Sequence, residues 1–400
     1  MASFEMVNVL EHCRLAPAPG TVDEKSLPLT FFDIPWLHFP LIQHLFFYEF
    51  PYPKSHFIDT IIPLLKHSLS LALKHFYPFA GKLIFPPNFG KPEIRYVSGD
   101  AVSLVFAESN KDFNHITGNH QRNVAEFHSL VAQLPPVSII SDLLVAPLLA
   151  VQVTLFPNSG ICIGFTFRRV TADGNACTRF IRSWASINKV GRETTMVESG
   201  SQRQLSTNKV IATFILGQSH VQQLKKWVLS QCPTSSHVST FTVTCAYVWT
   251  CMVKARERSG EKVTEDEFEH FVFGADCRAL LQPPLPATYF VAAKTIGEAI
   301  QERLRKKEGV LKDAEKWISE FETRKEDRIV GVAGSPRFAV YDIDFGLGKP
   351  KKSEVVSIDM TGSISLNECK NDKESFEIGL SLPKIKMDAF EDIFANGFQV

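Results

Sequence analysis

The sequence predicts a mixed α/β protein built from two domains of similar size. Strand-like and helix-like segments interleave in both halves, which is typical of α/β and mixed α+β proteins. A chain of 400 residues with 44% hydrophobic residues is long enough for two cores. Residues 188–208 have little apolar content and no clear period, as expected of a linker. We therefore predict a first domain over 1–187, a linker over 188–208 and a second domain over 209–400.

In the first half, alternating apolar residues predict a strand within 3–18, and apolar residues at helical spacing predict a helix over 58–74. Pro78 and Gly81 end that region and turn the chain. Strand-like runs follow at 92–98, 101–109, 148–156 and 160–167. The last of them leads into Asp173, after which residues 175–187 are predicted to be a helix.

The second half begins with a predicted strand over 209–217 and helices over 219–229 and 239–256. Further strands are predicted over 269–278, 337–346, 354–366 and 375–383. A last helix is predicted over 386–398, with Phe390, Ile393 and Phe394 on one face. No short repeat and no low-complexity tract is visible in the sequence.

Composition excludes several classes of function. Lys plus Arg equals Asp plus Glu at 43 each, so the chain lacks the charge expected of a protein that binds nucleic acid or an anionic membrane. The 8 cysteines form no CxxC pair, which favours a reduced protein without a structural metal site. The most apolar stretch, residues 143–156, is too short and too interrupted to span a bilayer. We expect a soluble, cytoplasmic monomer.

Two segments could carry chemistry. A tight Ala172-Asp173-Gly174 turn follows a buried strand and could present side chains at a sheet edge, although a plain surface turn has the same signature. Far along the chain, glycines at 346 and 348 after Asp344 indicate a sharply turned loop. Neither a dinucleotide-binding fingerprint nor a phosphate-binding loop is present.

Several segments together resemble the plant BAHD acyltransferases, in particular the branch that acylates flavonoid and anthocyanin glycosides. These segments are FYPFAGKL at 76–83, TFRRVTADG at 166–174, TCAYVWTCMVKA at 244–255, DCRALLQPPLPATYF at 276–290 and VAGSPRFAVYDIDFGLGKP at 332–350. The resemblance implies two similar domains of the CoA-dependent acyltransferase fold with a tunnel between them. It implies acyl transfer from malonyl-CoA or hydroxycinnamoyl-CoA, as co-substrate, to a sugar hydroxyl of a phenolic glycoside, with no resident cofactor and no metal.

The resemblance also implies roles for single residues. RRVTADG stands against the family's HxxxDG, so Arg169 occupies the position of the histidine base, and Asp173 with Gly174 holds the loop. DFGLG stands against DFGWG, so Asp344, Phe345, Gly346 and Gly348 form a structural loop, with Leu347 in place of tryptophan. The family's aspartate in this loop pairs with an arginine, and Arg278 is the candidate partner of Asp344.

Arg169 is the main departure from the family. Arginine has no acceptor nitrogen and stays protonated, so it cannot take a proton from a hydroxyl. Loss of a general base costs roughly 10²–10⁴-fold in rate. None of the 12 histidines lies four residues before an aspartate. Arg169 could instead bind a carboxylate, a CoA phosphate or an oxyanion, or it could simply pair with Asp173 or point into water.

Further departures are apparent deletions. The family's YFGN segment reads Tyr289-Phe290-Val291-Ala292 here and is followed by a shortened segment, and the linker over 188–208 is shorter than the family's crossover.

The resemblance places residues with small hydroxyl side chains near the pantetheine of CoA. Here these are Ser239 and Thr240, but the cap of a helix explains them equally well. Lys254 could contact a CoA phosphate or be a solvated helix residue. The alternative function is an inactive homologue that only binds CoA or a phenolic glycoside, or a non-functional product.

Overall fold

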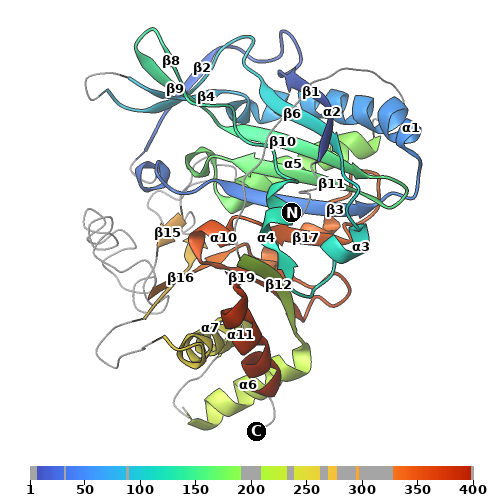
Figure 1. The fold of residues 1–400 in the computed structure, drawn as a ribbon. Coiled ribbons are helices and arrows are strands. Elements are labelled where there is room, and N and C mark those ends of the chain that lie inside the picture. Colours follow the sequence, from blue (N-terminus) through green and yellow to red (C-terminus); the bar gives the residue numbers. More distant parts are fainter. Residues whose placement is uncertain are drawn as a thin grey trace.

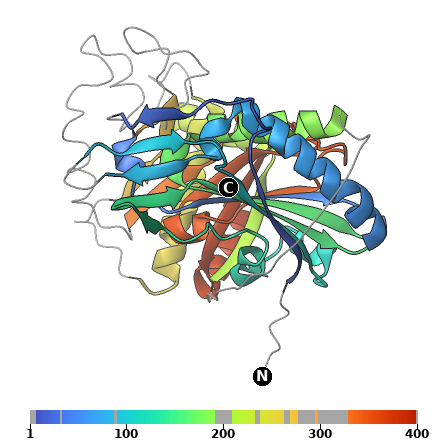
Figure 2. The ribbon, with the colours of Figure 1, turned by 90° about the horizontal axis from the view of Figure 1, so that it is seen from above.

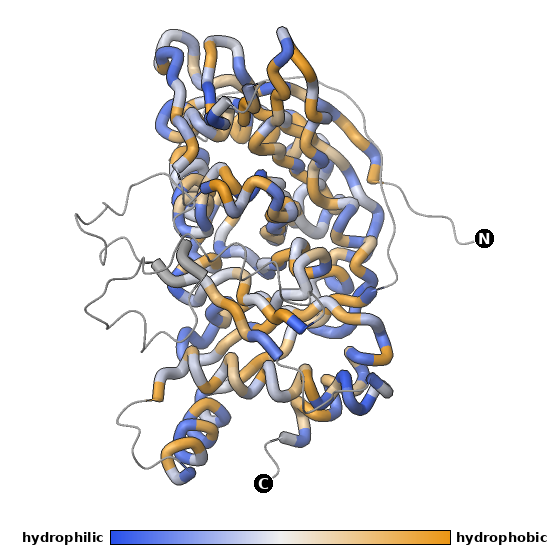
Figure 3. Tube along the Cα trace, turned by 90° about the vertical axis from the view of Figure 1, so that its left-hand side faces the viewer, coloured by the Kyte–Doolittle hydropathy of each residue, from blue (hydrophilic) through white to orange (hydrophobic). Residues whose placement is uncertain are grey.

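The computed structural model describes residues 7–30, 33–86, 90–190, 209–231, 238–261, 269–276, 294–296 and 328–397. Two large sheets lie one above the other in Figure 1, each with helices packed on it. Hydrophobic stretches run through both the upper and the lower part of the molecule, as expected for two cores (Figure 3). The predicted mixed α/β class is confirmed, since strands and helices alternate along both halves.

The first sheet has six strands in the order β1-β6-β10-β11-β3-β17. The strands are β1 (Asn8–Leu15), β6 (Val102–Glu108), β10 (Leu149–Phe156), β11 (Gly160–Phe167), β3 (Ile42–Glu49) and β17 (Lys352–Val355). Every residue of β10 and β11 is buried, because both faces of the sheet are covered. This burial explains why both strands read as continuous apolar runs rather than as alternating ones.

Two helices cover one face of the first sheet: α2 (Ile62–His75) and α5 (Gly174–Val190). They pack against each other above the strands (Figure 2). The other face of the sheet, with Leu45 and Phe47, packs on α3 (Phe113–Ile116), α4 (Val124–His128) and Ile211 of the second sheet. The first sheet therefore lies between α2 and α5 on one side and α3, α4 and part of the second sheet on the other.

The second sheet has the order β13-β16-β18-β19-β12-β7. Its strands are β13 (His270–Val272), β16 (Ile329–Ala333), β18 (Ile364–Glu368), β19 (Phe376–Pro383), β12 (Lys209–Leu216) and β7 (Arg122–Asn123). The helices α6 (Gln218–Gln231), α7 (Thr240–Arg258) and α11 (Lys384–Asn396) pack around the second core below it in Figure 1.

Each large sheet takes one strand from the other half of the chain. β7 comes from the first half and pairs with β12, whereas β17 comes from the second half and pairs with β3. The two parts are therefore tied together by backbone pairing as well as by packing. The division into 1–187, 188–208 and 209–400 stays a prediction, and most of the proposed linker lies outside the described residues.

Smaller elements complete the fold. A third sheet contains β2 (Lys25–Pro28), β5 (Glu93–Tyr96), β4 (Lys82–Phe85), β9 (Leu143–Pro147) and β8 (Ser138–Ile140), and β14 (Gly274–Asp276) pairs with β15 (Lys294–Ile296). Short helical pieces are η1 (Ile34–Trp36), α1 (Lys54–His56), η2 (Phe57–Ile61), η3 (Tyr77–Phe79), η4 (Arg169–Thr171), η8 (Pro336–Phe338), η9 (Val340–Asp342) and α10 (Ile358–Thr361). Among the described helices, none combines the length and hydropathy needed to cross a membrane.

The predicted strand over 337–346 was wrong. That segment forms two short 3-10 turns, η8 and η9, separated by Ala339 in a left-handed conformation at φ +46°. Its apolar alternation reflects the burial of Val340, Tyr341, Ile343 and Phe345 against the first core rather than strand pairing. The predicted strand over 354–366 is likewise divided: β17 ends, α10 follows, and Gly362 at φ +63° leads the chain into β18.

Candidate functional site

The turn that follows β11 is buried rather than exposed. The backbone N–H of Arg168 still bonds to the carbonyl of Leu148 at 2.9 Å, and the chain then makes the single turn η4. Asp173 is 1% exposed and caps α5: its Oδ1 accepts from the N–H of Ala176 at 2.8 Å, and its carbonyl accepts from Cys177 at 2.9 Å. Asp173 therefore holds the start of α5 through its own side chain.

Arg169 lies inside the protein, with only 6% of its surface exposed. Its Nη1 donates to the carbonyl of Ala172 at 3.0 Å, and its Cζ lies 4.2 Å from the centre of the Trp36 ring. Burial lowers the pKa of Arg169, and the negative charges of Asp173 and Asp33 work against that shift. The guanidinium therefore packs on an aromatic face and does not point into water, which was one of the alternatives.

These contacts decide what Arg169 can do chemically. A guanidinium over an indole ring gains a cation–π attraction of about 2 kcal/mol when both are desolvated. One of its nitrogens is already bonded to Ala172, and none of its nitrogens can accept a proton. Arg169 therefore stabilises the turn and offers no site for proton abstraction.

The loop around Asp344 is organised by the aspartate itself. Asp344 Oδ1 accepts from the backbone N–H groups of Gly346 at 2.7 Å and Gly348 at 2.9 Å, and Oδ2 lies 2.6 Å from Lys189 Nζ. Both glycines have positive φ, +77° and +84°, which residues with a Cβ rarely adopt. Arg278, the partner expected from the sequence, lies outside the described residues. The partner seen is Lys189, a surface lysine that no spacing rule in the sequence indicates.

One helix, α5, joins the two motifs. Its first residue, Gly174, packs so closely on Phe338 that a Cβ at position 174 would lie 2.9 Å from the Phe338 ring. At its other end, Asn188 Nδ2 donates to the carbonyl of Phe345 at 2.8 Å. The Phe345 ring meets Trp184 edge-on, with ring centres 4.9 Å apart. The two predicted motifs, at Gly174 and at residues 344–348, are thus connected through α5: Gly174 begins this helix, and Phe345 contacts its other end. Leu347 packs against the same core.

The predicted CoA contacts lie elsewhere, on α7. Ser239 caps that helix, its Oγ accepting from the N–H of Thr242 at 3.1 Å, and Thr240 Oγ1 accepts from Lys225 at 2.7 Å. Lys254 is exposed. α7 packs with α6 and α11 around the second core, whereas α5 packs with α2 on the first sheet. The capping role of Ser239 was the alternative that the sequence left open.

Replacing Asp344 with asparagine is expected to destabilise the protein by about 1.5–3 kcal/mol at pH 7, the range for hydrogen bonds to a charged group. Burial disfavours the Asp344 carboxylate, but Lys189 and the N–H groups of Gly346 and Gly348 outweigh it and lower its pKa. The stabilisation is therefore complete above the unfolded pKa, about 4, and disappears as the pH falls through the folded value. Urea unfolding of both proteins from pH 7 downward measures it.

Asp342→Asn is the matched control, since the Asp342 carboxylate pairs with the exposed side chains of Lys349 and Lys373. Exposed pairs contribute about 0–1 kcal/mol, so the control should lose less. An Asp344→Asn difference that stays constant down to acid pH would contradict the assigned role of the carboxylate.

Comparison with known proteins decides the family. The chain matches the profile of the Transferase family over residues 5–208, 192–296 and 290–396. The chain belongs to this family, the BAHD acyltransferases. It is 42% identical to a malonyl-coenzyme A:anthocyanin 3-O-glucoside-6''-O-malonyltransferase from Dahlia pinnata, covering 100% of this chain and 99% of the relative. It is 38% identical to phenolic glucoside malonyltransferase 1 from Nicotiana tabacum, over 98% and 99% of the two chains.

Solved structures support the fold of this BAHD acyltransferase. Vinorine synthase superposes with a TM-score of 0.70 at 18% identity over 96% of both chains. TRI101 of F. sporotrichioides, solved with coenzyme A and T-2, gives 0.62 at 14% identity over 92% of this chain and 97% of that one. The predicted two-domain acyltransferase fold is confirmed by these likenesses, while the tunnel between the domains stays a prediction.

The three matched ranges of this BAHD acyltransferase overlap one another over residues 192–208 and 290–296. These are the places where the sequence indicated missing residues. The alignment with the Dahlia relative runs over 457 positions although this chain has 400 residues, so the relative carries residues that this chain lacks. The shortening at the linker and after Phe290 stays a prediction.

Proposed function

We propose that this chain is an acyl-CoA-dependent O-acyltransferase of the kind that acylates the sugars of flavonoid and anthocyanin glycosides, with strongly reduced turnover. Malonyl-CoA and hydroxycinnamoyl-CoA are the proposed donors. The relatives named for anthocyanin glucoside malonylation and the 34% identical coumaroyltransferase 2 of Arabidopsis thaliana support both donor types. The proposed acceptor is a glycosylated phenolic compound.

The reduced turnover rests on one observation, the environment of Arg169. Its guanidinium packs on Trp36 and bonds to the carbonyl of Ala172, so the side chain is both unable to accept a proton and held in place. Activation of a sugar hydroxyl needs an acceptor atom at this position. Loss of a general base costs roughly 10²–10⁴-fold, which is the reduction we expect.

The same observation favours a second function, binding without turnover. A chain that keeps the fold and the loop around Asp344 but lacks the base could still bind CoA or a phenolic glycoside. In both readings Ser239, Thr240 and Lys254 are proposed CoA contacts, and Asp173 and Asp344 hold the surrounding turns. We also propose a cytoplasmic monomer. The free state of all six cysteines within the described residues supports the cytoplasmic part of this proposal, because thiols stay reduced in that compartment.

The test measures binding and turnover separately on the purified chain. Isothermal titration with malonyl-CoA and p-coumaroyl-CoA measures binding, and mass spectrometry of mixtures with flavonoid glucosides measures transfer. We expect binding of at least one acyl-CoA, and transfer about 10²–10⁴-fold slower than by the Dahlia relative assayed alongside. Equal rates would overturn the impairment. Binding without product favours the second function, and the absence of both overturns both proposals.

A further inference from the structure

Two histidines, His115 and His120, lie side by side where the first half of the chain enters the second sheet. His115 is on α3, and His120 stands two residues before Arg122, the first residue of β7. His120 Nε2 lies 3.1 Å from His115 Nδ1, and the ring centres are 4.7 Å apart. Both residues are exposed, so an ion in solution has access to the pair.

The spacing of the two rings fits a shared metal ion. With metal–nitrogen distances of about 2.0–2.1 Å, two ligand nitrogens stand about 2.9 Å apart at a right angle and about 3.3 Å apart at the tetrahedral angle. The observed 3.1 Å lies between these values. A head-on N–H···N bond of this length would hold the ring centres roughly 5.4 Å apart. The shorter distance of 4.7 Å means that the rings are tilted toward each other, as two ligands of one ion are.

Glu126 is placed to orient one of the two rings. Its Oε2 lies 3.5 Å from His115 Nε2, the ring nitrogen that does not face His120. This oxygen is buried and has no hydrogen-bond partner within the described residues. Histidines that bind metals commonly donate the N–H of their second nitrogen to a carboxylate, which leaves a lone pair on the nitrogen that faces the ion. Glu126 lies in the position of that carboxylate.

Gly118 leaves room for the second ring. A Cβ at position 118 would lie 2.6 Å from both Cε1 and Nδ1 of His120, closer than a real Cβ approaches another side chain. The His120 ring therefore packs directly on the backbone between α3 and β7, an approach that only glycine permits. The direction of the second ring is thus set by the turn as well as by its neighbour His115.

We propose that His115 Nδ1 and His120 Nε2 bind one zinc ion or a similar divalent transition metal, with Glu126 positioning His115. Imidazole nitrogens suit zinc, copper and nickel, whereas magnesium prefers oxygen ligands. No group of three or more His, Cys, Asp or Glu side chains that could hold a metal ion occurs in the described part of the chain, so water completes the coordination. The ion ties α3, which packs on the first sheet, to the segment that leads into β7 of the second. The proposal does not rest on the chain being able to transfer acyl groups.

The test titrates the untagged, chelator-treated full chain with Zn²⁺ at about pH 7.5, where a histidine with the ordinary pKa of about 6.5 is neutral. Calorimetry measures affinity and stoichiometry, and thermal unfolding measures the rise in melting temperature that binding to the folded state produces. We expect binding of Zn²⁺, a melting temperature that rises with the Zn²⁺ concentration, and no response to Mg²⁺. No binding of Zn²⁺, or an equal response to Mg²⁺, would overturn the proposal.

Variants locate the ion. His115→Ala and His120→Ala should each weaken Zn²⁺ binding at least tenfold, because each removes one of the two protein ligands. Glu126→Gln should weaken it about tenfold, the lower end of the range for partners of ligating histidines. Gly118→Ala should also weaken it, although both ligands remain. Unchanged affinity in both histidine variants would place the ion elsewhere and contradict the proposal, and unchanged affinity in Glu126→Gln would overturn the positioning role of Glu126.

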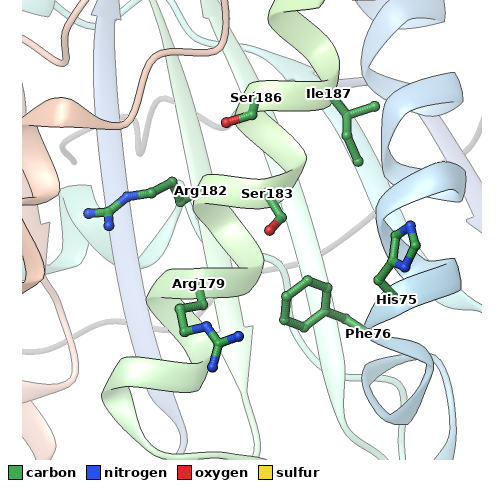
Figure 4. A pocket seen from close by; sticks show the side chains of 7 residues that line it. All are labelled: His75, Phe76, Arg179, Arg182, Ser183, Ser186 and Ile187. Carbon is green, nitrogen blue, oxygen red and sulfur yellow. The ribbon is translucent and has the colours of Figure 1, made fainter. Parts of the chain in front are cut away.

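His75→Ala is the matched control, since His75 is an exposed histidine at the end of α2. Its ring lies beside Phe76 and Ile187 in a shallow surface hollow between α2 and α5 (Figure 4). None of the seven residues that line this hollow is a second histidine, a cysteine or a carboxylate. His75→Ala should therefore bind Zn²⁺ as tightly as the unaltered chain. A loss in His75→Ala as large as in His120→Ala would contradict the assignment of the ion to the histidine pair.

Discussion

Arg169→His is expected to raise acyl transfer by about 10²–10⁴-fold, because it restores an acceptor nitrogen that can take the proton of the sugar hydroxyl. The exchange removes the cation from the face of Trp36 and the bond to the carbonyl of Ala172, both of which hold Arg169 in its present place. Asp173 keeps its role as the cap of α5, since its bonds to Ala176 and Cys177 do not involve Arg169. The helix start should therefore survive the exchange.

The measurement compares both proteins with malonyl-CoA or p-coumaroyl-CoA and a panel of flavonoid glucosides, with products identified by mass. Arg169→Gln is the control, because it removes the charge without supplying a base and should stay as slow as the unaltered chain. A gain in Arg169→Gln would show that the charge of Arg169, rather than the missing base, limits transfer. Absence of product in Arg169→His, in a protein that melts cooperatively, would assign the defect to the segments where the sequence predicts missing residues, the linker over 188–208 and the segment after Phe290.

Arg122→Met is expected to destabilise the protein by about 3–5 kcal/mol, because it leaves a buried carboxylate without its partner. Arg122 Nη1 lies 2.9 Å from Glu354 Oε1, and their side chains are 0% and 2% exposed. Arg122 also donates to the carbonyls of Ile116 and His120, each at 2.9 Å. Arg122 lies on β7 of the second sheet and Glu354 on β17 of the first, so this pair joins the two sheets.

Urea unfolding measures the loss, and a second variant separates its cause. Arg122→Met combined with Glu354→Leu should recover most of the lost stability, because a buried apolar pair is about as stable as a buried ion pair. Arg258→Met, which breaks the exposed pair with Asp392, should cost less than about 1 kcal/mol. A double variant as unstable as Arg122→Met alone would mean that the carbonyl contacts of Arg122, rather than its charge, carry the stabilisation.

Long periodic segments were predictable from the sequence. The apolar runs of β10 and β11 and the helical spacing of α5, α7 and α11 are local patterns, and each element lies where its pattern predicted. The segment 337–346 was not predictable in this way, because a buried irregular loop can show the same alternation as a strand. The left-handed Ala339 within it has no residue-type signal, unlike Gly346 and Gly348 in the following loop.

The sequence by itself determined the family, the two motifs and the absence of a base at position 169, because residue identity alone says whether a side chain has an acceptor atom. Only the tertiary structure decided that Arg169 packs on Trp36, that Asp344 pairs with Lys189 and that Arg122 meets Glu354. The partners in each of these pairs are distant in sequence and carry no spacing signal. Their chemistry depends on burial, which the whole fold around them sets.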